Sequence, residues 1–319
     1  MNKPFVLAHL SDPHLGPLPQ PRVHELASKR VIGYINWQRS RHRIHRRDAL
    51  DAITHDLRGE QPDHVAVTGD LVNIALPAEF AHARHWLDTL GRPADVSVVP
   101  GNHDAYVAAA GIHRDRQWSP YMAGDDTSQA NVPPSPNLGR PQPTWVGGGE
   151  TFPYLRRRGP MALIGLSSAI ATPPFMATGR LGERQITRMT EMLDALRTLF
   201  RVVMIHHPPI DLPSAYHKRL IDAAGFRQAI GVVGAELIIH GHDHVHALTW
   251  LVGNDRHVPV VGVPSASAAP GTKHAGAYNL YSVDGVPGAW RCEVVSRGLR
   301  PSGAVAELSR RALSWSGKQ

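Results

Sequence analysis

Short apolar runs recur along the chain, and most of them end in aspartate, glycine or histidine before turn residues and a helical pattern. Runs of this length between turn residues are typical of buried β-strands. They are Phe5–Leu10, His64–Val67, Val96–Val99, Met161–Leu166, Val202–Ile205 and Leu237–Ile239. Because the runs alternate with helical patterns, they predict βα units and a largely parallel central sheet.

Helices are predicted where apolar residues recur every three or four positions and so share one helix face. Three segments show this pattern: Asp48–Leu57, Pro77–Leu90 and Glu183–Phe200. Residues 117–149 are instead crowded with proline, glycine, serine and asparagine, which is typical of a loop. Loops of this length are either functional or disordered, and the functional interpretation is a lid over a site.

The pattern changes after Gly241, where no helix is predicted between strand-like runs that are joined by glycine and proline turns. These runs are His257–Val263, Ala277–Val283 and Trp290–Val295. They predict an antiparallel second sheet that closes the fold. From Pro301 the pattern is weakly helical, so we expect one domain over residues 1–300 and a peripheral tail over residues 301–319.

Composition indicates a folded protein and limits the side chains that could hold a metal. Hydrophobic residues make up 42% of the 319 positions and charged residues 19%, which favours a buried core over disorder. Cys292 is the single cysteine, which excludes an internal disulfide and a thiolate zinc site. Any metal must therefore be held by histidine, aspartate and asparagine.

Charge and hydropathy bear on partners and location. The net charge of +7 and the isoelectric point near 9.8 favour anionic partners, such as phosphorylated metabolites, nucleic acid or an acidic membrane surface. A strand-like run starts at Phe5 without a basic and apolar leader, and no stretch reaches the ~18 apolar residues of a membrane span. We therefore expect a soluble, unexported protein of the cytoplasm.

Side chains that can bind metals follow five of the predicted strands. They are Asp12, His14, Asp70, Asn102, His103, His206, His242 and His244. The carboxyl ends of parallel strands meet at one crevice, so we expect these side chains to form one polar cluster. Two divalent ions about 3.5–4 Å apart need a shared carboxylate, and Asp70, alone between Gly69 and Leu71, is the candidate.

The residue types also narrow the choice of metal. Imidazole and carboxylate ligands suit manganese, iron or zinc, whereas calcium and magnesium prefer shells made almost entirely of oxygen. Glycines precede three of the candidate segments, at Gly69, Gly101 and Gly241. We expect them to relax the backbone so that the next residue can turn toward a metal.

Taken together, these segments resemble the signature of the calcineurin-like metallophosphoesterases: Asp-x-His, Gly-Asp, Gly-Asn-His-Asp or Glu, a lone His, and Gly-His-x-His. Every element occurs in that order over residues 8–246. The run His206-His207-Pro208-Pro209 makes the chain most similar to the bacterial branch with cyclic-nucleotide phosphodiesterases and glycerophosphodiesterases. The resemblance implies an α/β fold of two stacked mixed β-sheets flanked by helices, in the four layers α/β/β/α.

The resemblance also implies two divalent metal ions and a role for each candidate residue. The first metal is implied to bind Asp12, His14, Asp70 and His244. The second metal is implied to bind Asp70, Asn102, His206 and His242. His103 is implied to face the phosphate, where it protonates the leaving oxygen or stabilises developing charge. The implied mechanism is in-line attack by a hydroxide that bridges the metals.

Other residues have structural interpretations beside functional ones. Asp104 either orients His103 or caps the following helix. His9 is expected to pack inside the first strand, and His207 and His246 flank candidate ligands and could line the pocket. Surface positions are expected for His64, His82 and His85.

The densest basic segment runs from Trp37 to Arg47. One interpretation is a solvated helix face. The other is attraction of an anionic substrate or, with apolar neighbours such as Ile35, peripheral contact with an acidic membrane. The run Arg156–Arg158 has the same two interpretations.

The leading functional hypothesis is a phosphodiesterase that acts on a small or lipid-linked phosphodiester. A phosphomonoesterase would use the same metals. A pyrophosphohydrolase acting on UDP-2,3-diacylglucosamine would suit the basic segment, although His103 stands where the best-known enzymes of that type have arginine. A non-catalytic adaptor is disfavoured because every ligand is retained, and a nuclease because the basic clusters lack interleaved aromatic residues.

Overall fold

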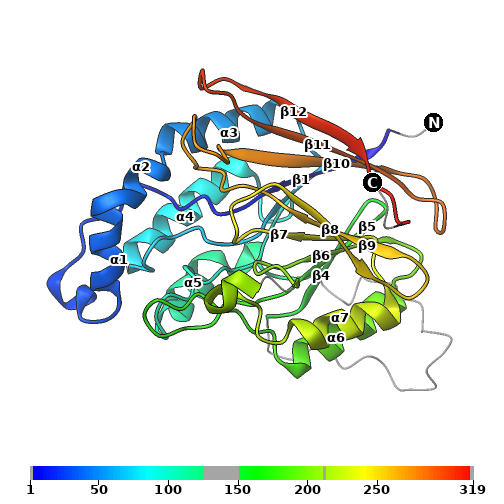
Figure 1. The fold of residues 1–319 in the computed structure, drawn as a ribbon, viewed down its shortest axis with the longest axis horizontal. Coiled ribbons are helices and arrows are strands. Elements are labelled where there is room, and N and C mark those ends of the chain that lie inside the picture. The colour runs from blue at the N-terminus through cyan, green and yellow to red at the C-terminus, as the bar shows by residue number, and fades with distance from the viewer. Residues whose placement is uncertain (1–2, 126–150, 211–212, 317–319) are drawn as a thin grey trace.

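The computed structural model describes residues 3–125, 151–210 and 213–316, and its ribbon is shown in Figure 1. Most of the loop expected as a lid, residues 126–149, lies outside the described residues. Its first part is not a loop, because residues 117 and 118 end α5 (Ala110–Trp118) and a 3-10 turn follows at η3 (Ser119–Tyr121).

Two six-stranded mixed sheets form the centre of the fold, as expected. The strand order of the first sheet is β12 (Val305–Ala312), β11 (Arg291–Leu299), β10 (Ala277–Asp284), β1 (Phe5–Leu10), β2 (His64–Val67) and β3 (Val96–Val98). The order of the second is β4 (Tyr154–Arg158), β5 (Met161–Gly165), β6 (Phe200–Met204), β7 (Leu237–His240), β9 (His257–Gly262) and β8 (Ala247–Val252).

Alternating side chains stack the sheets against each other and against helices. In β6, Phe200, Val202 and Met204 join the core between the sheets, whereas Val203 packs on the other face with α6 and α7. This alternation follows from the two-residue period of a strand, so an uninterrupted apolar run can serve two cores. Figure 1 shows the helices outside the sheet pair, with α6 and α7 along the second sheet.

Two of the three predicted helices are confirmed, since the pattern over Asp48–Leu57 falls in α3 and that over Pro77–Leu90 in α4. The described helices are α1 (Arg30–Asn36), α2 (His42–Ile44), α3 (Arg47–Gly59), α4 (Pro77–Leu90), α5, α6 (Glu183–Ala195) and α7 (Ala223–Val233), with shorter turns η1 (Val23–Leu26), η2 (Trp37–Arg41) and η4 (Pro213–Lys218). The helix predicted over Glu183–Phe200 is too long, because Phe200 already begins β6. The pattern did not predict α7, whose two glycines weaken helix propensity and whose packing on α6 compensates.

The prediction of a separate antiparallel sheet after Gly241 is wrong. β9 pairs in parallel with β7 and so extends the second sheet, while β10 pairs with β1 and extends the first. The expected helix after Pro301 is also wrong, because β12 pairs antiparallel with β11. Local periodicity predicts strands but cannot identify their partners, and at the exposed β12 edge the pairing decides the conformation.

Arg156, the first residue of the run Arg156–Arg158, has a structural role. Arg156 is buried in β4 and donates hydrogen bonds to the carbonyls of Pro93, Val96, Pro120 and Ala123. Its cationic group therefore holds the segments around β3 in place.

Among the residues that the structure describes, no helix is long and apolar enough to span a membrane.

A buried ion pair joins the second sheet to its helices. Arg201 of β6 contacts both oxygens of the Glu236 carboxylate, at 2.8 and 3.0 Å, and donates to the carbonyls of Leu193 and Val233. Its side chain is 7% exposed and that of Glu236 is 5% exposed. The guanidinium therefore provides hydrogen bonds to backbone carbonyls at the carboxyl ends of both α6 and α7.

We predict that Arg201→Met lowers the free energy of unfolding by about 3–5 kcal/mol, because it leaves the Glu236 carboxylate buried without its partner. Urea denaturation followed by circular dichroism measures this change. The matched control is Arg291→Met, which removes an exposed ion pair with Asp284 and should leave the midpoint nearly unchanged. Equal effects of the two substitutions would contradict the structural role of Arg201.

Candidate metal centre

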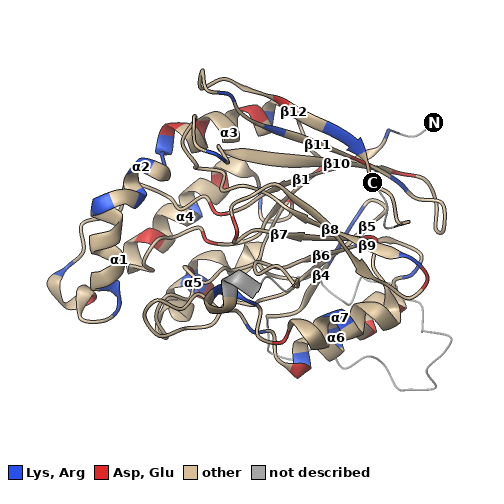
Figure 2. Cartoon of the chain, in the orientation of Figure 1, with Lys and Arg blue, Asp and Glu red and all other residues tan. Residues whose placement is uncertain are grey.

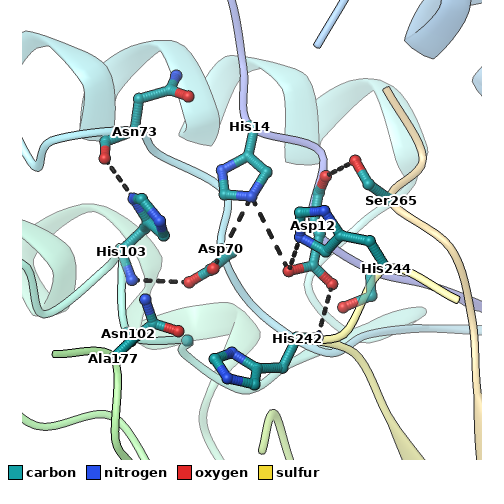
Figure 3. Close-up of polar contacts among 12 residues, drawn as sticks. Asp12, His14, Asp70, Asn73, Asn102, His103, Ala177, His242, His244 and Ser265 are labelled. Carbon is teal, nitrogen blue, oxygen red and sulfur yellow. Dashed lines mark hydrogen bonds and ion pairs between the residues drawn. The ribbon is translucent and has the colours of Figure 1, made fainter. Parts of the chain in front are cut away.

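The seven candidate ligands meet at the carboxyl ends of five strands that come from both sheets. In the first sheet, β1 leads into Asp12 and His14, β2 into Asp70, and β3 into Asn102. In the second sheet, β6 leads into His206 and β7 into the turn that carries His242 and His244. Figure 3 shows the side chains from the first sheet facing those of the second. All are buried except His244, whose side chain is 32% exposed. The predicted cluster is therefore present, and it straddles the two sheets.

The ligand loops adopt an unusual backbone conformation. Five candidate ligands have positive φ angles: Asp12 (52°), His14 (38°), Asp70 (54°), His242 (70°) and His244 (55°). Residues other than glycine adopt this region only when their surroundings compensate for the strain. Hydrogen bonds between the first two loops, from Asp12 N to Gly69 O at 2.9 Å and from His14 N to Asp70 O at 3.0 Å, supply that compensation.

The three glycines of the motifs have different functions. Gly69 has a φ of 98°, so its expected backbone freedom is confirmed. Gly101 and Gly241 do not have positive φ; a β-carbon at Gly101 would collide with the Asp70 carboxylate, and one at Gly241 with Ser11 and the Asp12 carboxylate. These two glycines therefore provide space beside the ligands rather than conformational freedom.

Asp104 has neither of the roles expected for it. One carboxylate oxygen accepts hydrogen bonds from the amides of Asp70 and Gly101, at 2.8 and 2.9 Å. The other accepts from the amides of Leu71 and Val72, at 2.9 and 3.1 Å. Asp104 thus fixes the loop that carries Asp70 to the loop that carries Asn102.

The first set of ligand atoms surrounds the space beside Asp12. His244 Nε2 lies 3.0 Å from Asp12 Oδ1, and His14 Nε2 lies 3.9 Å from Asp12 Oδ1 and 3.8 Å from Asp70 Oδ2. Ligands bonded to one metal at about 2.0–2.1 Å are roughly 3–3.4 Å apart in octahedral or tetrahedral shells. The distance between His244 Nε2 and Asp12 Oδ1 lies in this range, whereas the two distances from His14 Nε2 are about half an ångström longer, so a divalent ion would draw His14 closer to the carboxylates.

The second set of ligand atoms meets the first at Asp70. His206 Nε2 lies 3.5 Å from Asp70 Oδ2, 3.2 Å from Asn102 Oδ1 and 3.3 Å from His242 Nδ1. Asp70 Oδ2 is thus close to one histidine of each set, as a bridging carboxylate must be. Asp12, Asp70 and His206 also form one compact group of three potential ligand atoms.

The electrostatics of the cluster favour cation binding. Burial alone would raise the pKa of the Asp70 carboxyl, but His206 and His103 hold it well below its usual range. Burial lowers the pKa of His14 and His242 well below the ordinary value, so these imidazoles are neutral. Burial opposes the charged form of His206 too, yet Asp70 raises the pKa of His206 to about 10. A proton on His206 therefore offsets the carboxylates, and a metal would displace it.

His103 lies beside the first set of ligands, and its ring forms another group of potential ligand atoms with His14 and Asp70. Its backbone N–H donates to Asp70 Oδ1 at 2.7 Å, and its Nδ1 contacts the carbonyl of Asn73 (Figure 3). The carbonyl fixes the proton on Nδ1, which leaves Nε2 directed toward Arg41 Nη1 at 3.1 Å. Burial and the Arg41 guanidinium lower the pKa of His103 to about 4.

Arg41 is the residue of the basic segment that reaches the centre. Its Nη2 lies 3.3 Å from His14 Nδ1 and 3.2 Å from His14 Nε2, and this nearly equal spacing places it over the imidazole face. The in-plane lone pair of His14 Nε2 stays available for a metal. Arg41 forms no carboxylate ion pair within the described part of the chain. The basic segment is thus not simply a solvated helix face.

His45 was not predicted as part of the site. Its ring centre lies 4.3 Å from that of His14, and together with His244 these residues form another group of potential ligand atoms. Its Nδ1 contacts Ser267 Oγ at 3.0 Å, which orients the ring. No metal motif includes His45, and its place in an arginine-rich run concealed its burial.

The other histidines divide between the core and the site. His9 is buried and contacts Thr68 Oγ1 at 2.9 Å, as expected for a packed residue. The prediction that His64 lies at the surface is wrong, since it is buried and contacts Ser97 Oγ at 2.8 Å. His207 Nε2 contacts the carbonyl of Ala177 at 3.0 Å, and its ring lies beside His206 and His242, with which it forms another group of potential ligand atoms.

The centre opens into a cleft of about 700 Å³. Ligands from both sets line its floor, and α1, η2, η4 and the segment around Phe175 form its walls. The fold and the site together define the class of metal-dependent hydrolases, in which a cleft beside the ligand residues would admit a substrate.

Comparison with known proteins identifies the family. Residues 5–246 match the family described as calcineurin-like phosphoesterase, and the chain belongs to it. Members of this family bind a dinuclear metal centre, which agrees with the two ligand sets that share Asp70. No curated protein matches the chain in sequence.

Solved structures share the fold at low sequence identity. A dimetal phosphatase from Danio rerio superposes with a TM-score of 0.56 at 14% identity, over 99% of this chain and 100% of that one. A purple acid phosphatase from yellow lupin (Lupinus luteus) seeds gives 0.57 at 11% identity, over 99% of this chain and 55% of that one. The chain thus spans about half of the lupin protein, and at these identities the likeness concerns the fold.

We predict that Asp70→Asn abolishes turnover and lowers the bound metal from two ions to one or none per chain, because the bridging charge is lost. Metal analysis of purified, reconstituted protein measures the stoichiometry. Asp243→Asn is the matched control, since it changes the same group inside the Gly241–His244 turn without a ligand role. Full metal content and activity in the Asp70 variant would refute the bridge.

Proposed function

We propose that the protein is a phosphoric diester hydrolase that uses two divalent ions, manganese, iron or zinc. The observation that carries this proposal is the convergence of seven ligand side chains into two sets that share Asp70 Oδ2. The retention of both sets also speaks against a non-catalytic adaptor. Two metals in such a centre would supply Lewis acidity for the phosphoryl oxygens and lower the pKa of bound water.

Two residues beside the ligands, Arg41 and His103, could bind the phosphate and protonate the leaving oxygen. Arg41 lacks a carboxylate partner within the described residues and lies between His14 and His103, so its two terminal nitrogens can bind phosphate oxygens. His103 presents Nε2 to the same space. A bound phosphate anion favours the imidazolium form, which can then donate a proton from Nε2 to the leaving oxygen.

The preference for a diester rests on charge and space. A diester carries one negative charge, which the guanidinium of Arg41 matches, and the cleft extends from the centre to walls where a second ester group would fit. A phosphomonoesterase is the second candidate, because Lys29, Arg39 and Lys218 also line the cleft and would suit a dianion. A pyrophosphohydrolase would use the same centre. A cytoplasmic location, with peripheral contact to an acidic membrane, remains part of the proposal.

A substrate panel on metal-reconstituted protein tests the proposed function. The panel contains bis(p-nitrophenyl) phosphate, p-nitrophenyl phosphate, cyclic nucleotides, glycerophosphodiesters and UDP-2,3-diacylglucosamine. We expect a higher kcat/KM for diesters than for the monoester. Exclusive turnover of the monoester would replace the diesterase with a phosphomonoesterase, and turnover of the UDP-linked compound alone would indicate a pyrophosphohydrolase.

We predict that His103→Ala keeps both metals but slows turnover by about 10²–10⁴-fold for esters with poor leaving groups, because the proton donor is lost. The loss should be much smaller for p-nitrophenyl esters, whose leaving group needs little protonation. Rates across a series of phenyl esters, measured beside metal content, test this role. Loss of both metals in the variant would show that His103 holds the centre instead.

We predict that Arg41→Ala raises KM for the substrate and the inhibition constant of inorganic phosphate by roughly 10- to 100-fold, since a hydrogen bond between charged groups is lost. Arg41→Lys should recover part of this loss. Arg43→Ala is the matched control, because Arg43 is exposed in the same segment and should leave both constants unchanged. Equal constants for Arg41→Ala and the original protein would exclude phosphate binding by Arg41.

A further inference from the structure

We propose that the cleft contains a binding site for an apolar group of the substrate, so that the natural substrate is an amphiphilic phosphate ester. The phosphate would lie at the metal centre, and an alkyl or comparable apolar group would lie between α1 and the segment around Phe175. This inference rests on the proposed hydrolase activity and names the class of ester that the same site takes.

The first wall of the apolar site is one side of α1. Ile32 and Ile35 line the cleft and are 38% and 44% exposed. Cationic residues stand at both ends of this apolar stretch, with Lys29 one turn before it and Arg39 one turn after it. Positions three or four residues apart share a helix side, so the wall is apolar in its middle and cationic at its ends.

A second wall of the cleft presents an exposed aromatic side chain. Phe175 lines the cleft, is 83% exposed and has a φ of 65°, a strained value for a residue with a bulky side chain. The backbone around it is held in place: Thr172 Oγ1 donates to Met176 O at 2.6 Å, and Ala177 N donates to His217 O at 2.8 Å. A fixed, strained turn that exposes an aromatic ring to a cleft is the kind of feature found at ligand sites.

The two walls are fastened to each other and to the fold. Lys29 Nζ donates to Thr172 O at 2.7 Å and lies 4.3 Å from the centre of the Tyr106 ring. Gly33 allows α1 to lie close to Ile74 and Tyr106, because a β-carbon at position 33 would collide with both side chains. The separation of Ile32 and Ile35 from Phe175 is therefore set by the fold, as a preformed binding site requires.

The position of the apolar side chains identifies their occupant. They line the same cleft as His14, Asp70 and His103, so a group bound against them belongs to a molecule that also reaches the metal centre. Figure 2 shows lysine and arginine around α1 and α2, which suits the anionic end of an amphiphile. Apolar contact continuous with a cationic, metal-binding floor fits a molecule with one phosphate and one apolar group better than a partner protein.

Two pairs of probes test the inference on the metal-loaded, full-length protein. Methyl p-nitrophenyl phosphate and hexyl p-nitrophenyl phosphate share the leaving group and the charge and differ only in the alkyl chain. Methylphosphonate and hexylphosphonate serve as the matching inhibitors of whichever aryl phosphate the protein hydrolyses. We expect the hexyl compounds to show roughly tenfold higher kcat/KM and roughly tenfold lower inhibition constants.

Substitutions at Ile35 and Phe175 test whether these side chains cause the preference for hexyl over methyl compounds. Ile35→Ser and Phe175→Ser should each shrink the ratio between hexyl and methyl compounds toward one. Ile112→Ser is the matched control, because Ile112 is 74% exposed on α5 outside the cleft lining, and it should leave the ratio unchanged.

Each outcome decides the inference. Equal constants for methyl and hexyl compounds overturn it while the proposed diesterase stands. If neither diester is hydrolysed but p-nitrophenyl phosphate is, the diesterase proposal fails, and the two phosphonates still decide whether an apolar group is bound. A chain-length effect that Ile35→Ser and Phe175→Ser leave intact also overturns it. Binding to phosphatidylglycerol vesicles through Ile32 and Ile35, with no chain-length effect, assigns the walls to a membrane surface instead.

Discussion

Two buried carboxylates, Asp12 and Asp70, stand close enough to repel each other, and much of the surrounding structure serves to keep them ionised. Burial disfavours both charges, yet neighbouring histidines hold the pKa of each carboxyl below its usual value. Such a cluster is costly unless cations compensate it. His14 and His242 are neutral, which is the form in which imidazole binds a metal, and a metal would displace the proton that His206 carries.

The fold meets this constraint by bringing loops of two sheets together. Cross-loop hydrogen bonds hold left-handed residues such as Asp12 and His14, and Asp104 joins the loops that follow β2 and β3. Gly101 and Gly241 leave room for the carboxylates that face them. Any one of these contacts is local, but together they set the spacing of ligand atoms from five strands. The sheets behind the loops therefore act as the rigid base of the centre.

The side chains that cluster were predictable from sequence because each motif joins a strand end to a turn and a side chain with defined chemistry. The two-sheet architecture was predictable only through the resemblance, since periodicity alone misassigned the partners of β9 and β10 and gave β12 the wrong conformation. Arg41 and His45 were harder still. They reach the centre from a segment between β1 and α3, and only the tertiary fold shows which members of a basic run turn inward. The apolar walls at Ile35 and Phe175 depend on the same long-range packing.

The central claim is that Asp70 bridges two cations held by residues of both sheets. Anomalous diffraction from crystals of manganese-reconstituted protein, recorded at the manganese edge, tests it most directly. We expect two peaks about 3.5–4 Å apart on either side of the Asp70 carboxylate, one beside His14 and one beside His206. A single peak, or peaks outside this cluster in fully active protein, would contradict the account.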